Sequence, residues 1–229
     1  MCSTASSHWI ESMPARKPAW VNHLVEETHR NKSQMVVYQG SIHLEHKSQT
    51  SKEYVMSDVP LEQAIQWRLD WLPISLLHIS KDVWMEYRPV AVNGSATKWY
   101  QGTDSLPDRI PIVGYIYRWT LLEAPYFHTT VEAMLSPYFI NLNMYKISFN
   151  IKVDEFDSAN PPAYNVSLYH IKTMPIYTLL EVALVGTPRR PGCILRPIDG
   201  LSKSPHKLSL KNYKVMSYME TLPNDTREF

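Results

Sequence analysis

The sequence predicts an α+β fold, a mainly antiparallel sheet accompanied by a few helices. Three observations lead to this class. Several segments alternate apolar and polar residues with the two-residue period of a strand, while one stretch shows clear helical spacing. Hydrophobic residues make up 44% of the 229 residues, and charged residues make up only 20%. This composition supplies a large core and excludes intrinsic disorder over most of the chain.

The N-terminal part of the chain is expected to be irregular at first and regular afterwards. Residues 1–34 show no steady period, which predicts a loose arm. Residues 36–44 alternate and predict a strand with one buried face. Ser57 or Asp58 can cap a helix that Pro73 ends, because the apolar residues between them recur at helical spacing.

The middle of the chain is expected to add strands around a long loop. Apolar runs predict strands over residues 74–79, 83–92 and 112–122. Residues 93–111 are polar and contain Gly and Pro turn residues, so we expect a loop there. Residues 123–136 predict a short irregular or helical connection to the next strand.

The C-terminal half carries the clearest strand pattern, over residues 147–153. An acidic turn over 154–157 is expected to lead into a partner strand over 166–172. Residues 176–185 fit either a helix or a buried strand, and residues 193–198 predict an edge strand.

The domain organisation follows from the absence of any Gly/Ser-rich divider. We expect one α+β domain over residues 35–200, preceded by the arm and followed by a basic tail over 201–229. Cys2 and Cys193 are too few for a disulfide framework and favour a reducing compartment. The N-terminus lacks the pattern of a secretory signal, and no apolar stretch has the roughly 18 residues of a membrane span.

A basic segment over residues 189–214 stands out from an otherwise balanced chain of 23 Lys and Arg against 22 Asp and Glu. Its basic residues are Arg189, Arg190, Arg196, Lys203, Lys207, Lys211 and Lys214. Such a segment is attracted to phosphate, either of lipid headgroups or of nucleic acid. A solvated face that binds nothing is the alternative interpretation.

The residues give no positive indication of an enzyme. The seven glycines form neither GxGxxG nor a Walker loop, and no GxSxG serine is present. His43 and His46 are three positions apart on a predicted strand and face opposite sides, which disfavours a shared metal ion. Asp154, Glu155 and Asp157 are expected to be solvated turn carboxylates rather than an acid–base pair. We therefore expect no enzymatic activity, no cofactor and no metal.

Two short features suggest contacts with partners. Pro161, Pro162 and Tyr164 form a PPxY sequence, in which the prolines preset the polyproline II conformation and the tyrosine fills a second pocket of a WW domain. A chance occurrence is the alternative. Trp99 and Tyr100 stand in the middle of the polar loop, where large aromatic side chains either fold back onto the core or are held out for a partner.

The segment SPYFINLNMYK over residues 136–146, with the alternating strand and the acidic turn that follow, resembles the matrix proteins of rhabdoviruses, especially the vesiculovirus kind. Those proteins have a Pro-Phe-Asn segment, a Tyr-Lys pair, an alternating strand and an acidic turn in that order. Upstream, the strand from Val36, the extended segment 54–59 and the helix ending near Leu72 follow the same succession. The likeness spans residues 35–200.

The resemblance implies a non-enzymatic protein that self-associates beneath a viral envelope, binds anionic membrane and the viral nucleocapsid, and drives assembly and budding. It implies a place in the virion, in the host cytoplasm and nucleus, and at the inner face of membranes. The family's PPxY late-budding motifs recruit host WW-domain ubiquitin ligases, a role that falls here on Pro161, Pro162 and Tyr164. The long loop of that fold makes assembly or membrane contacts, a role that falls on Trp99 and Tyr100.

Two other classes of protein stay open at this point. One is a nucleic-acid-binding viral protein, such as a plant-virus movement protein, in which Tyr213 or Tyr218 would stack on bases beside the basic residues. The other is a sheet-rich small-molecule binder or enzyme with a deep apolar cavity.

Overall fold

The computed structural model describes residues 9–11, 17–43, 46–47, 54–55, 67–76, 111–120, 128–147, 151–152, 161–173, 176–186, 192–198, 205–206 and 209–210. These residues form mainly strands together with two helices, which confirms the predicted sheet-rich α+β class. The helices are α1 (Ala19–Arg30) and α4 (Pro137–Ile147). The strands are β1 (Trp9–Glu11), β2 (Val36–His43), β3 (His46–Lys47), β4 (Tyr54–Val55), β5 (Pro73–Leu76), β6 (Ile112–Thr120), β7 (His128–Leu135), β8 (Ile151–Lys152), β9 (Ala163–Thr173), β10 (Ile176–Val185), β11 (Ile194–Pro197), β12 (Pro205–His206) and β13 (Ser209–Leu210).

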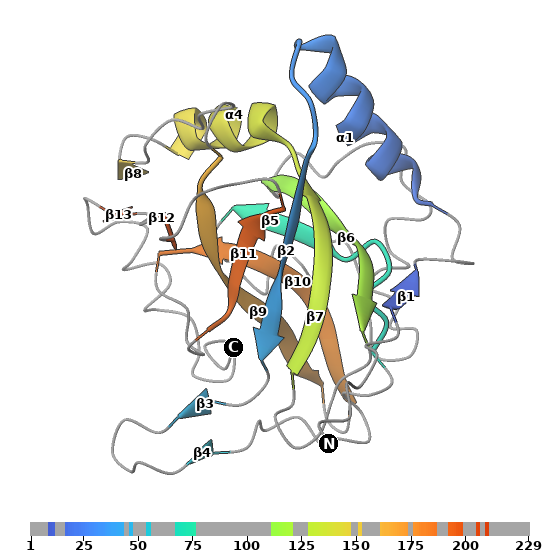
Figure 1. Cartoon of the computed structure of the whole chain (residues 1–229), viewed down its shortest axis with the longest axis vertical. Coiled ribbons are helices and arrows are strands. Elements are labelled where there is room, and N and C mark those ends of the chain that lie inside the picture. Colours follow the sequence, from blue (N-terminus) through green and yellow to red (C-terminus); the bar gives the residue numbers. More distant parts are fainter. Residues whose placement is uncertain are drawn as a thin grey trace, which may run out of the picture.

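Seven of these strands close into a barrel, a feature that the sequence did not predict (Figure 1). Their order is β6, β5, β10, β9, β11, β2 and β7, and β7 pairs again with β6. The pairing of β5 with β10 is parallel, and the other pairings of the ring are antiparallel. Because the ring closes, each of its strands has a neighbour on both sides, which removes the long open edges that invite association.

The barrel interior holds the main hydrophobic core, to which every strand of the ring contributes. In β2, Tyr38 and Ile42 are buried while the residues between them are more exposed, as the alternating pattern predicts. Gly40 lets β11 approach β2 closely, because a Cβ at this position would collide with the carbonyl group of Ile194. A core of this kind stabilises the fold by roughly 25 cal/mol for each Å² of apolar surface removed from water.

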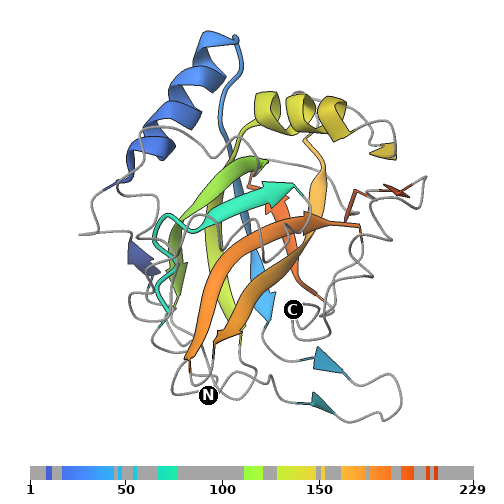
Figure 2. The same ribbon diagram turned by 180° about the vertical axis from the view of Figure 1, so that it is seen from behind.

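The two helices cover different parts of the barrel. Helix α4 lies across one end of it and inserts the fully buried Ile140 into the main core (Figures 1 and 2). Helix α1 packs against β6 on the outside of the barrel and next to α4. A second hydrophobic cluster lies beneath α1 and joins Trp20, Val21 and Leu24 of the helix to Ile112, Tyr115 and Leu180 of the strands.

A chain of buried hydrogen bonds connects the two helices. Ser136 is the cap of α4, and its Oγ accepts the backbone N–H of Phe139 at 3.1 Å, with Pro137 in the first helical position. The Thr28 hydroxyl donates to the carbonyl oxygen of Leu24 at 2.6 Å. The Ser136 hydroxyl therefore donates to Thr28 Oγ1, which is 2.7 Å away. The start of α4 is thus tied to the interior of α1.

The prediction of a loose arm over residues 1–34 is wrong for residues 19–30, which form α1. The buried side of this helix consists of Trp20, Val21, Leu24 and Thr28. Because its last member is a threonine that is buried through hydrogen bonds, the apolar spacing breaks off too early to reveal a helix.

The predicted helix over residues 57–72 is wrong at its C-terminal end, and its earlier part lies outside the described residues. Residues 67–72 form a turn in which Trp71 has a φ of 60°. The buried Asp70 carboxylate holds this turn by accepting Trp119 Nε1–H at 3.0 Å and Arg68 Nε–H at 2.7 Å. These partners lie on another strand and across the turn, so helical spacing alone could not reveal them.

Three further predictions are corrected. Residues 128–135 form β7 rather than a connection, and Ile147 ends α4 rather than beginning a long strand. β11 lies between β9 and β2 instead of at an edge. The strands expected over 36–44, 74–79, 112–122 and 166–172 are confirmed where they are described, and residues 176–185 form the strand alternative. The strand over 83–92, the loop over 93–110 and the acidic turn lie outside the described residues.

Candidate functional site

The PPxY residues lie where β9 begins, and their tyrosine is inside the barrel. Tyr164 is 1% exposed, and its ring centre is 6.0 Å from that of Tyr38. The Tyr38 hydroxyl donates a 3.0 Å hydrogen bond to the carbonyl oxygen of Pro162, which fixes the segment against the core. Burial raises the pKa of both phenols well above the ordinary value. A WW domain must take the tyrosine into its own pocket, so the predicted role of Pro161, Pro162 and Tyr164 is wrong for the folded chain.

The other predicted site residues are described only in part. Arg196 is on β11 and exposed. Lying outside the described residues are Arg189, Arg190, Lys203, Lys207, Lys211 and Lys214 of the basic segment and Trp99 and Tyr100 of the loop. Two short strands from the predicted tail pair with the rest of the chain: β12 runs parallel to β9, and β13 pairs with β8.

The outer face of β11 combines a cation with apolar side chains. Leu195 and Pro197 are buried, so the alternate residues Ile194, Arg196 and Ile198 point outward. Ile198 is 49% exposed and is the large hydrophobic residue that stands out as exposed within the described chain. β11 and β12 both pair with the beginning of β9, on opposite sides of that strand. The face can therefore meet a surface that is both anionic and apolar.

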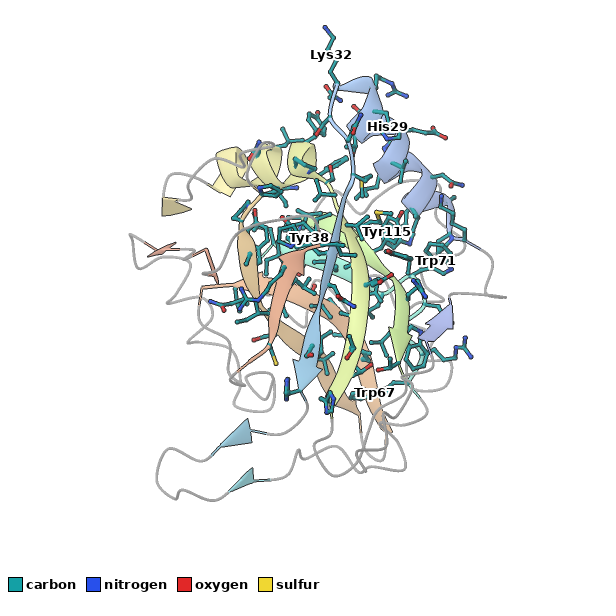
Figure 3. The ribbon with its side chains drawn as sticks, in the orientation of Figure 1. His29, Lys32, Tyr38, Trp67, Trp71 and Tyr115 are labelled. Carbon is teal, nitrogen blue, oxygen red and sulfur yellow. The ribbon has the colours of Figure 1, made fainter. Side chains whose placement is uncertain are left out.

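A groove runs between α1 and the barrel, with a volume of about 710 Å³. Figure 3 shows His29 on α1, Tyr115 on the barrel wall below the helix, and Lys32 at the end of the helix, extending into solvent. The groove is lined by Lys17, Val25, His29, Lys32, Ser33, Gln34, Met35, Tyr115 and Met134. It therefore has polar and basic residues at the ends of α1 and an apolar floor between them.

Sequence reasoning missed this groove because its helix was expected to be a loose arm. A signal was present in the spacing of Val25 and His29, which are four positions apart and share one side of a helix. The contribution of Tyr115 and Met134 could not be foreseen, because both reach the groove from strands whose pairing is set by the closed barrel.

A second group of chemically active residues lies at the other ends of β2 and β7. The rings of His43 and His128 stack with their centres 5.7 Å apart. The buried thiol of Cys193 accepts the backbone N–H of His43 at 3.2 Å. Because the thiol interacts with the backbone of His43, the contact secures β2 against the start of β11. No three potential metal ligands come together anywhere in the described part of the chain.

In comparisons with known proteins, no family model, curated protein or solved structure matches the chain. Neither helix in the described ranges has the length and apolar character of a membrane span.

Proposed function

We propose that this chain is a non-enzymatic, matrix-type viral protein that associates with the inner face of an anionic membrane, with other copies of itself and with the nucleocapsid. The observation that carries the proposal is the outer face of β11, where exposed Arg196 stands between Ile194 and Ile198 in the middle of the basic segment. Each Lys or Arg near an anionic bilayer contributes about 1 kcal/mol of binding. Apolar side chains that enter the headgroup region add to this attraction.

Flotation of the full chain with liposomes tests the membrane contact. Vesicles that contain phosphatidylserine are compared with neutral phosphatidylcholine vesicles over a salt series. We expect binding that needs the anionic lipid and weakens as salt rises, since salt screens exposed charges. A chain that stays in the soluble fraction with both vesicles at every salt concentration would end the proposal.

Variants locate the contact on the molecule. Arg196→Gln and Ile198→Ser are each expected to reduce flotation, by about fivefold for the lost charge. Arg30→Gln on α1 is the matched control, because it removes the same charge from an exposed residue elsewhere and should leave flotation unchanged. Equal losses from Arg196→Gln and Arg30→Gln would mean that net charge alone, and not this face, drives binding.

The same salt series with single-stranded RNA in place of vesicles separates the matrix-type function from nucleic-acid binding. Affinity for RNA should fall steeply with salt if phosphate contacts dominate. Tight RNA binding without flotation would mean that the basic segment binds nucleic acid and not membrane.

Self-association is the second part of the proposal and involves the loop over residues 93–111. Replacing Trp99 and Tyr100 by Ala is expected to leave the monomer folded and to shift sedimentation towards smaller species, since large aromatic residues dominate many interfaces. Unchanged assembly of the double variant would remove this loop from the interface.

A further inference from the structure

The groove beside α1 is open to solvent and has the volume of a ligand site. Its volume of about 710 Å³ lies within the range of about 300–1,000 Å³ that small-molecule sites occupy. One wall is helical and the other is the barrel, and the hydrophobic cluster beneath α1 holds the two walls together. The groove is distant in sequence from the β11 face, and its ligand is independent of the membrane contact proposed above.

Positive charge in the groove has no carboxylate to balance it. Lys17 and Lys32 line the groove, and no Asp or Glu is among its lining residues. Within the described chain Lys17 and Lys32 form no ion pair, whereas Arg30, Arg68 and Arg118 each pair with a carboxylate. These cations are therefore available to an anion from outside the chain.

Helix α1 carries two acidic residues, Glu26 and Glu27, and neither lines the groove. Glu27 pairs with Arg30 and accepts Asn31 Nδ2–H at 3.1 Å. Val25 and His29 share one flank of the helix, and Glu27 is on the other, because two residues advance the helix by about 200°. The carboxylate thus does not reach the cations of the groove.

The backbone at the end of α1 is already satisfied without the cations. Ser33 N–H donates to the carbonyl oxygen of Thr28 at 3.1 Å, and Lys32 N–H donates to that of His29 at 2.9 Å, which is a Schellman motif. Lys32 has a φ of 56°, at the position of this motif where glycine is favoured. A lysine here strains the backbone and adds a charge at the rim of the groove, so it is not explained by the helix end alone.

The floor of the groove suits an alkyl chain. Val25, Met35 and Met134 pack against the cluster beneath α1 and are only partly buried. Methionine side chains adapt to ligands of variable shape because they are unbranched and polarisable. The phenol of Tyr115 is protonated at neutral pH and can donate a hydrogen bond in the groove, and burial raises its pKa further above the ordinary value.

We propose that this groove binds a single-chain amphipathic anion, an alkyl chain that ends in a carboxylate or a phosphate. The chain lies on the apolar floor, and the anionic group lies at the end of α1 beside His29, Lys32 and Ser33. Lys17 attracts the same charge from the other end of the helix. The class of ligand follows from the pairing of an apolar floor with uncompensated cations.

Calorimetric titration of the full chain below the critical micelle concentration tests this ligand class. The probes are dodecanoate and dodecyl phosphate, with dodecyltrimethylammonium and dodecyl maltoside as matched chains of opposite and no charge, and inorganic phosphate as a head group without a chain. We expect saturable one-to-one binding of the two anions, with the other probes at least about tenfold weaker. Equal binding of the cationic chain, or of inorganic phosphate alone, would overturn the proposal.

Two substitutions on α1 show whether binding occurs in this groove. Val25→Trp fills it and is expected to weaken dodecanoate binding by at least about tenfold, since the new ring occupies the floor. His23→Trp places the same ring on an exposed part of α1 outside the groove and is expected to leave binding unchanged. Circular dichroism verifies that both variants stay folded. Unchanged binding by folded Val25→Trp would overturn the proposal.

Lys32→Gly separates recognition from stability. Glycine relaxes the positive φ, so the variant should unfold at a higher temperature than the parent chain. If the lysine serves the ligand, dodecanoate binding should nevertheless weaken by about two- to fivefold, the range for one exposed charge. If Lys32→Gly is more stable but binds dodecanoate as well as the parent chain, Lys32 does not contact the ligand. If Lys17→Gln also binds dodecanoate unchanged, the two lysines do not attract the anion, and the proposal is wrong.

Discussion

The inside of the barrel and the groove under α1 are both lined by aromatic and aliphatic side chains, but they differ in whether their polar side chains have partners within the protein. Inside, the Asp70 carboxylate has Trp119 and Arg68 as partners, and the Tyr38 hydroxyl has the carbonyl of Pro162. In the groove, Lys17 and Lys32 form no ion pair with the described chain. Buried polar groups that are matched by protein partners specify a fold, whereas unmatched cations beside an apolar floor are typical of recognition.

The largest expected effect comes from the barrel interior. Tyr164→Ala removes a buried aromatic ring that packs against Tyr38, and it should lower the free energy of unfolding by about 3–5 kcal/mol. Urea denaturation measures the loss. Pro161→Ala, which alters the same PPxY sequence at a partly buried residue, should cost far less. Equal stability of Tyr164→Ala and the parent chain would mean that the tyrosine is accessible after all.

A smaller and more local effect is expected beneath α1. Leu24→Ala removes a fully buried side chain between the helix and β6, which should cost about 2–4 kcal/mol. Hydrogen exchange tests whether the loss is local: amides of α1 should lose more protection than amides of β2 and β9. An equal loss of protection in α1, β2 and β9 would show that the helix and the barrel unfold as one unit, which would contradict a separate stability for the region beneath α1.

Breaking the chain of hydrogen bonds between the helices should lower the free energy of unfolding by less than Leu24→Ala does. Thr28→Val keeps the side-chain shape but leaves the Ser136 hydroxyl without its acceptor, which should cost about 1–2 kcal/mol. Thr130→Val, on the partly exposed side of β7, is the control for replacing threonine by valine. Thermal unfolding measures both variants, and a loss no greater than that of the control would contradict the predicted role of the chain.

A further loss of stability is expected at alkaline pH. Burial raises the pKa of Tyr38 and Tyr164 far above the ordinary value, while burial and the hydrogen bond to Glu132 raise the pKa of Tyr117 to about 12. The folded chain thus keeps protons that the unfolded chain releases near about pH 10. The contribution of these tyrosines to the free energy of unfolding should be fully present below about pH 10 and should be lost as pH rises towards about 12 and beyond. Unfolding in urea at about pH 9 and about pH 11 gives the comparison, and equal midpoints would contradict it.

The strands that sequence could predict are those whose burial alternates, as in β2, where Tyr38 and Ile42 face the core. β7 escaped prediction because it carries buried polar residues. Thr129 donates to the carbonyl oxygen of Thr120 at 2.5 Å, and Glu132 accepts from Tyr117 at 2.9 Å. These partners belong to the neighbouring strand, so the sequence of β7 alone indicates exposure where the barrel provides hydrogen bonds.

The candidate sites were predictable to unequal degrees. Arg196 was named from charge alone, since a cluster of bases is visible without a fold. The groove was not, because it depends on α1 being a helix and on Tyr115 and Met134 reaching it from paired strands. The PPxY motif was visible in the sequence, but the prediction of its role failed because the closed barrel buries Tyr164, which a short sequence pattern does not reveal.

The strands of the barrel leave the ribosome in two groups, and each group forms one part of the barrel. β2, β5, β6 and β7 form a continuous half-barrel within residues 36–135, and β9, β10 and β11 complete it later by pairing with β5 and β2. Cys193, at the start of β11, lies 58 residues after Leu135, the end of β7, and these residues take roughly 3–12 s to synthesise. During that time both outer strands of the half-barrel are open templates for pairing. The nascent chain is therefore most prone to aggregate just before β9, β10 and β11 emerge, and protection by a chaperone would matter most at this stage of synthesis.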